Sequence, residues 1–441
     1  MLEQSVISHR GLDIDFDWLT SGVIETPDQA SFAALVIRVN SSNATELEDR
    51  CARTVRGYAR VSACQMALWF ATNWWRLRWE PQRQTLSWAM SHQLGAAGGG
   101  YAWPDLSFSS DGAFVRVQSR PTSDWPGTPT RYLRTFDERL PVQEFERGID
   151  HFMDAVIERI VMFRDLDTPL PALWAEVREE RETPEIAAWR KLEALLGFDA
   201  GEAPDSLIAS LQQYEAILSR SAVEEFAAAG SAETALNLQT LLAAEETAIP
   251  VVVDASDSLK TKIRHLSTRL LPWQRAECAA RMAREAWGLN RTEAINDQQL
   301  SELFSLPKGV NFDDYVHPDL VMGAGIRSLK KSKNFRVILS KRSPTGLRFE
   351  LARLVGDDLS AGPSERWLLA TGASTSRQKF QRAFAQEFLC PYQGLSEFFT
   401  SNKEPDEDDL EAVAAHYRVS PLLVKNTLVN HSQLERMVLE Q

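Results

Sequence analysis

The first third of the chain carries its apolar residues in short runs that favour β-strands. The segment Phe32 to Val39, FAALVIRV, is almost wholly apolar and predicts a buried strand. In the segment 106–119, LSFSSDGAFVRVQS, Asp111 and Gly112 separate two alternating runs and predict a β-hairpin. In the segment 74–81, WWRLRWEP, apolar side chains alternate with arginines, and this period of two predicts another strand.

Helical signals are fewer in this part of the chain. Thr45 and Glu48 have the spacing of a capping box, which predicts a helix over residues 43–59. Eight of the thirteen tryptophans lie before residue 126, so a core rich in aromatic side chains is expected. Together these patterns predict an aromatic-rich α+β domain over residues 1–140.

From residue 141 to residue 260 the pattern becomes helical. Apolar residues recur at spacings of three and four, charged residues fill the remaining positions, and Gly197 and Gly230 are suited to end helices. We therefore predict a helical connector over residues 141–260.

The third region, residues 261–441, is predicted to be mainly helical with a small sheet. Its expected elements are helices over 272–290, 346–359 and 377–391, a strand over 334–342, and a helix-turn-helix-like tail over 412–434. The fold class is therefore a multidomain α+β protein with three parts.

Composition narrows the class of protein further. An apolar fraction of 44% with 25% charged residues is ordinary for a globular protein. The chain has no apolar run near the roughly 18 residues of a membrane span, and its N-terminus lacks a signal-peptide pattern. The four cysteines are scattered, which suits reduced thiols. We expect a cytoplasmic protein that does not bind membranes. The net charge of −13 argues against a protein that binds nucleic acid over its whole surface.

The order of elements in about the last 170 residues resembles the ImmA/IrrE family of bacterial metallopeptidase-like proteins. That family has a zinc helix of the form R-F-x-L-A-H-E-x-G-H, a later helix ending F-A-x-x-L-L-x-P, and a tail with a V-S turn. The matching framework residues are Arg348, Phe349, Leu351, Ala352, Gly356, Phe384, Ala385, Leu389, Pro391, Val419 and Ser420. The resemblance implies a zincin-like fold for the C-terminal domain.

The residues that would carry zinc chemistry do not match the family pattern. Arg353 and Asp357 occupy the two histidine positions, and Leu354 occupies that of the catalytic glutamate. The stretch 377–382, where the family has its third ligand, contains no acid. An arginine charge about 4 Å from Zn²⁺ would cost roughly 8 kcal/mol at an effective dielectric constant near 20. We therefore expect no zinc, no other cofactor and no catalytic residues, and Arg353 could instead pair with Asp357 one helical turn away.

A local excess of positive charge is the main functional signal. Residues 327–382 hold 13 Lys and Arg against 4 Asp and Glu, although the whole chain is acidic. Arginine side chains suit phosphate and carboxylate groups, so an anionic ligand, an acidic protein partner or nucleic acid could bind here. The alternative is that these charges form a solvated face or pair with nearby acids. The candidate ligand-binding residues are Arg348, Arg353, Asp357, Arg377, Lys379 and Arg382.

By the resemblance, the expected function is that of a non-catalytic regulator or sensor in bacterial stress response or defence against phages and mobile elements. It would bind an anionic ligand or a protein partner in the former zinc cleft. One alternative is a divergent metal-dependent peptidase that uses Asp357, Asp358 and a distant histidine such as His317. Another is a DNA-binding regulator that uses the basic window and the tail, with Arg418 and Lys425 near the second tail helix.

Overall fold

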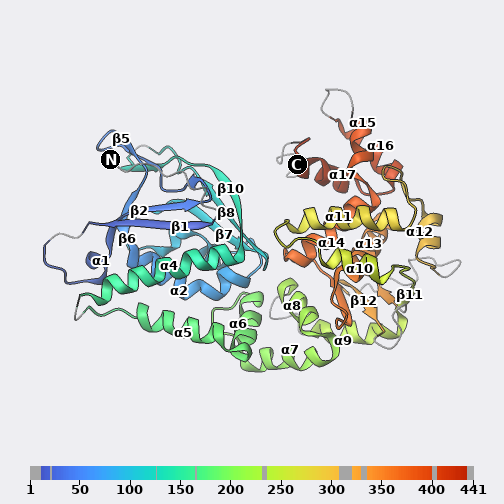
Figure 1. Ribbon diagram of the computed structural model, residues 1–441, viewed down its shortest axis with the longest axis horizontal. Coiled ribbons are helices and arrows are strands. Elements are labelled where there is room, and N and C mark those ends of the chain that lie inside the picture. Colours follow the sequence, from blue (N-terminus) through green and yellow to red (C-terminus); the bar gives the residue numbers. More distant parts are fainter. Residues whose placement is uncertain are drawn as a thin grey trace. The chain divides into compact units, whose positions relative to one another are not determined.

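The computed structural model describes residues 11–19, 22–125, 127–163, 166–230, 236–306, 320–328, 335–399 and 405–434. The chain forms two compact units, Met1–Pro204 and Asp205–Gln441, each with its own helices and sheets (Figure 1). The predicted multidomain α+β class is confirmed. In the described residues, no helix is both long and apolar enough to cross a membrane.

The first unit contains three small antiparallel sheets. In one sheet β2 pairs with β1, β3 and β6; in another the order is β10-β8-β7; in the third it is β5-β4-β9. The strands are β1 (Leu12–Trp18), β2 (Phe32–Val39), β3 (Ser42–Asn43), β4 (Leu47–Asp49), β5 (Thr54–Arg56), β6 (Ala59–Ser62), β7 (Asp105–Ser110), β8 (Phe114–Arg120), β9 (Thr130–Tyr132) and β10 (Phe136–Pro141).

Two of the sequence predictions for this unit are confirmed. The apolar run 32–39 is strand β2, and the segment 106–119 is the hairpin formed by β7 and β8. The Asp111 carboxylate accepts hydrogen bonds from the backbone N–H groups of Ala113 (3.0 Å) and Phe114 (2.8 Å). Gly112 has φ of +92°, a left-handed conformation that glycine adopts without steric cost.

Two other predictions for this unit are wrong. The segment 74–81 lies mostly in helix α2 (Ala63–Trp79), which is buried on nearly all of its faces. Such a helix is apolar all round, so its sequence lacks the one-sided pattern of a surface helix. The capping-box segment 43–59 forms β4 and β5 instead of a helix, because the Thr45 hydroxyl accepts from the Ile37 N–H (3.1 Å) and holds a turn beside β2.

The helices of the first unit pack their aromatic side chains around α2. They are α1 (Pro27–Ala30), α2, α3 (Leu86–His92), α4 (Val142–Val161), α5 (Leu170–Glu182) and α6 (Pro184–Leu196). Trp74 of α2 stacks on Phe145 of α4 with a ring-centroid distance of 6.4 Å and meets the edge of Trp174 of α5 at 5.4 Å. Helix α4 runs along β1 (Figure 1), where a Cβ on Gly148 would lie 2.3 Å from the Leu12 carbonyl oxygen.

The second unit has one sheet of order β11-β13-β12-β14 with helices around it. Its strands are β11 (Ile249–Val251), β12 (Gly323–Arg327), β13 (Phe335–Ile338) and β14 (Trp367–Ala370). Its helices are α7 (Asp205–Leu218), α8 (Arg220–Ala229), α9 (Leu236–Ala243), α10 (Asp257–Arg264), α11 (Pro272–Ala286), α12 (Asp297–Leu303), α13 (Pro344–Ser360), α14 (Ser376–Leu389), α15 (Tyr392–Phe398), α16 (Glu407–Tyr417) and α17 (Pro421–Asn430). The helices of the predicted middle region, 141–260, are therefore shared between the two units.

The predicted elements of the C-terminal region are confirmed. Helices α11, α13 and α14 cover the predicted segments, strand β13 lies within 334–342, and α16 and α17 form the two helices of the tail. Helices α13 and α14 pack closely because Gly356 has no side chain: a Cβ there would lie 2.4 Å from the ring of Phe384. This close packing brings the polar side chains of the two helices together.

Candidate functional site

Helices α13 and α14 position most of the predicted ligand-binding residues. Each helix begins at a hydroxyl cap: Ser343 accepts from the Gly346 N–H, and Thr375 accepts from the Gln378 N–H. The three residues at the family's histidine, glutamate and histidine positions, Arg353, Leu354 and Asp357, are all buried.

Arg353 lies in a network of neutral polar groups. Its Nη2 donates to the Thr371 carbonyl oxygen (2.7 Å) and to Oε1 of Gln378 (2.5 Å). In the described part of the chain, its Nε has no hydrogen-bond partner and no carboxylate lies within ion-pair distance. Burial, and then the nearby charge of Arg382, lower the pKa of Arg353 to about 10.

Asp357 pairs with α14 and not with Arg353, so the expected ion pair within α13 is wrong. Both Asp357 oxygens accept from Nε of Arg377 at 3.0 Å, and Oδ2 also accepts from Gln381 Nε2 at 2.9 Å. Nη2 of Arg377 also lies 2.9 Å from Oδ2 of Asp357, so the two side chains form an ion pair between α14 and α13. Burial raises the pKa of Asp357, while Arg377 opposes that rise.

Arg377 also donates to Glu365 (2.5 Å), so one guanidinium serves two carboxylates. Burial would lower the pKa of Arg377, but Asp357 and Glu365 raise it above its ordinary value. Arg377 is therefore held in its charged form.

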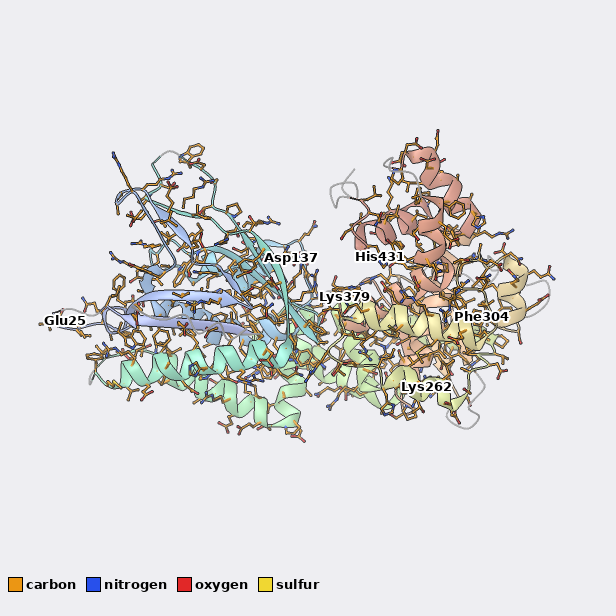
Figure 2. All side chains as sticks on the ribbon, turned by 45° about the horizontal axis from the view of Figure 1, so that its top comes forward. Glu25, Asp137, Lys262, Phe304, Lys379 and His431 are labelled. Atoms are coloured by element: carbon orange, nitrogen blue, oxygen red, sulfur yellow. The ribbon has the colours of Figure 1, made fainter. Side chains whose placement is uncertain are left out.

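The remaining predicted residues divide between two places. Arg382 lies on α14 and donates to the Ala373 carbonyl oxygen (3.0 Å); burial lowers its pKa. Lys379 lies on the same helix, three residues before Arg382 (Figure 2). Arg348 is held elsewhere, by Asp297 and the Ile295 carbonyl oxygen. The structure thus brings Arg353, Asp357, Arg377 and Arg382 together and separates Arg348 from them.

A further acidic residue of this cluster, Glu225, was not predicted from the sequence. Glu225 of α8 is buried and accepts from the Thr375 hydroxyl (2.8 Å) and from Gln378 Nε2 (2.9 Å). From the same helix, Ser221 donates to Glu365 (2.5 Å). Glu225 lies about 150 residues from its partners in the chain, and no local sequence signal marks that contact.

Two buried glutamines complete the network. Gln378 accepts from the Thr371 N–H (2.8 Å) and donates to Glu225, and both Gln378 and Gln381 donate to the Leu369 carbonyl oxygen (2.8 Å each). Each amide is fully buried with its donors used, so it fixes the relative position of β14 and α14.

Acidic residues pair with several arginines of the predicted basic window. Arg327 and Lys260 both pair with Asp358, and Arg336 and Arg366 both pair with Glu245. Residues 329–334, and His317 of the alternative metal site, lie outside the described residues. Over the described ranges, no group of three or more His, Cys, Asp or Glu side chains could hold a metal ion.

The basic residues of the tail are also paired. Arg418 pairs with Asp297, and Lys425 pairs with Glu407 at 2.7 Å. The first turn of α16 carries three acids, Glu407, Asp408 and Asp409. This surface therefore offers little uncompensated positive charge to a phosphate backbone.

Comparison with known proteins gives no relative: no protein-family model matches the chain, and no curated protein or solved structure matches it significantly. The resemblance to the ImmA/IrrE family therefore stays a prediction from the sequence.

Proposed function

We propose that the second unit is a non-catalytic, zincin-like domain of ImmA/IrrE type that acts as a regulatory or sensor module. The observation that carries this proposal is the position of Arg353. In the sequence, Arg353 aligns with a zinc-binding histidine of the family, and its guanidinium donates to Thr371 and Gln378. A cation held in that place opposes a metal ion, and the leucine at the glutamate position has no group to activate water.

The binding partner that we propose is an anionic ligand or an acidic protein surface. Arg353 and Arg382 support it, because both are at least half-buried and neither forms an ion pair within the described residues. A role in bacterial stress response or in defence against phages rests on the resemblance alone.

The two alternatives have weaker support. A metal-dependent peptidase would need Asp357 and Asp358 as ligands, yet both carboxylates are engaged by arginine or lysine side chains. A DNA-binding regulator would need Arg418 and Lys425 of the tail, and these pair with acids.

Thermal unfolding with and without metal tests the non-catalytic proposal. We expect the Tm to change by less than about 1 °C when a chelator such as EDTA, or zinc, is added. A zinc site filled at a thousand times its Kd would add about 4 kcal/mol, which corresponds to a rise of several degrees. A Tm that falls in EDTA and recovers with zinc, together with hydrolysis of an unfolded protein substrate, would contradict the proposal.

A further inference from the structure

We propose that Arg353, Arg382 and the start of α14 form a site for a phosphate group, and that Glu225 of α8, an internal anion beside this site, holds the Thr375 and Gln378 donors that a phosphate-bearing ligand takes over. This inference rests on the proposed function and deepens it. It names the class of ligand and the element that competes with it.

The first observation is a pair of guanidinium groups without a carboxylate partner. Over the described ranges, neither Arg353 nor Arg382 lies within 4.0 Å of an acidic oxygen. Arg353 is only 6% exposed, and its Nε is a buried donor without an acceptor. A buried donor without an acceptor is unfavourable, so a ligand oxygen that accepts from it would be favoured.

The second observation is the environment of Glu225. Its carboxylate is 8% exposed, yet its hydrogen bonds come from neutral donors, the Thr375 hydroxyl and the Gln378 amide. Burial raises the pKa of Glu225, and the charge of Arg377 opposes that rise. The carboxylate is therefore held near positive charge without the direct contact that would offset its desolvation.

Charge and geometry favour phosphate over a second carboxylate. Gln378 accepts from Arg353 and donates to Glu225, so the Glu225 carboxylate lies near Arg353 without pairing with it. The charge of Glu225 also acts on Arg382. A phosphate monoester carries about −1.5 to −2 charges at pH 7 and three strong acceptor oxygens. Thr375 also caps the N-terminus of α14, a 14-residue helix, and N–H groups at a helix start favour an anion. Gly372, in the loop before this helix, is exposed, so this loop is in contact with solvent.

The competition couples ligand binding to α8. The ligand and Glu225 need the same donors, Thr375 and Gln378, so binding weakens the attachment of α8. Ser219, directly before α8, has φ of +92°, which is strained for a residue with a side chain. Val223 and Phe226 anchor the helix by apolar burial. The apolar burial and the hydrogen bonds of Glu225 hold α8 in place, and the strain at Ser219 opposes them. A ligand that takes over these hydrogen bonds would therefore favour detachment of α8.

Chemical rescue of Glu225→Ala tests this proposal. We expect the Tm of this variant to rise by about 4 °C or more as inorganic phosphate increases to about 50 mM at constant ionic strength. The wild-type Tm should change much less, because Glu225 already holds the Thr375 and Gln378 donors. Acetate at the same ionic strength should give less than half of the effect. The double variant Glu225→Ala/Arg382→Met should lose the response to phosphate.

The other outcomes overturn the inference in distinguishable ways. A Glu225→Ala variant with no phosphate-specific rise contradicts the site, and an equal response to acetate contradicts the assignment to phosphate. If the variant folds only in phosphate buffer and unfolds when phosphate is removed, the site is supported. If it is insoluble in both buffers, phosphate cannot replace Glu225. The zinc content of the wild-type protein tests the proposed function independently of these results.

Discussion

Replacing Arg377 by methionine is expected to lower the free energy of unfolding of the second unit by about 3–5 kcal/mol. Arg377 joins Asp357 of α13 to Glu365, and Asp357 is only 1% exposed. Methionine fills a similar volume but leaves the buried carboxylate without its counter-charge. Hydrogen exchange of α13 and α14 peptides in increasing urea measures this loss locally.

Two further variants make the Arg377 prediction specific. Arg342→Met, at an exposed arginine near the start of α13, should change stability by less than about 0.5 kcal/mol. The double variant Arg377→Met/Asp357→Asn should lose less than the sum of the two single variants, because the partners interact directly. A loss below about 1 kcal/mol for Arg377→Met would mean that solvent screens this pair.

Acidification is expected to destabilise the first unit through His92, by about 2 kcal/mol between about pH 7.5 and pH 5. His92 is fully buried, stacks on Trp88, and donates from Nδ1 to the Trp88 carbonyl oxygen at 2.8 Å. Burial lowers its pKa from 6.5 to about 4, and the nearby charge of Arg76 adds to that effect. Glu80, 3.8 Å from Nδ1, is already paired with Arg76.

The sign of the effect follows from proton binding in the two states. Between about pH 6.5 and pH 4 the unfolded chain binds a proton at this histidine and the folded chain does not. The stability is therefore complete above this range and falls as the pH falls through it. His92→Phe should flatten the dependence measured by urea unfolding. Leu94→Ala, at a neighbouring buried residue, should lower stability at both pH values and keep the slope. An unchanged slope in His92→Phe would contradict the assignment.

Patterns within a short window predicted the elements that are buried on one face. The hairpin at Asp111 and Gly112 carries its own turn signal, and the stripe of Phe380, Phe384 and Phe388 marks the buried face of α14. In these elements the spacing of apolar residues along the sequence already shows which side chains are buried.

Other features depend on residues far apart in the chain and could not be predicted in this way. Helix α2 was mistaken for a strand because its arginines are buried with distant partners: Arg76 pairs with Asp199, 123 residues away. The alternation of apolar residues and arginines in this segment therefore does not mark one solvent-exposed face and one buried face.

The candidate site was predicted only in part for the same reason. The basic residues of α13 and α14 could be found from the local excess of charge, but the acid that each of them contacts could not. Asp357 accepts from α14 and not from Arg353, and Glu225 arrives from α8. A charge count over a sequence window cannot show which charges are already paired in the fold.

The central claim is the proposal that Arg353 and its network exclude a metal ion from the position that aligns with the family's zinc site. Elemental mass spectrometry of the purified protein after mild dialysis tests it most directly. We predict that zinc and other transition metals are present only at trace level, far below one ion per chain. One zinc ion per chain, retained through dialysis, would contradict the claim and would require a different set of ligands.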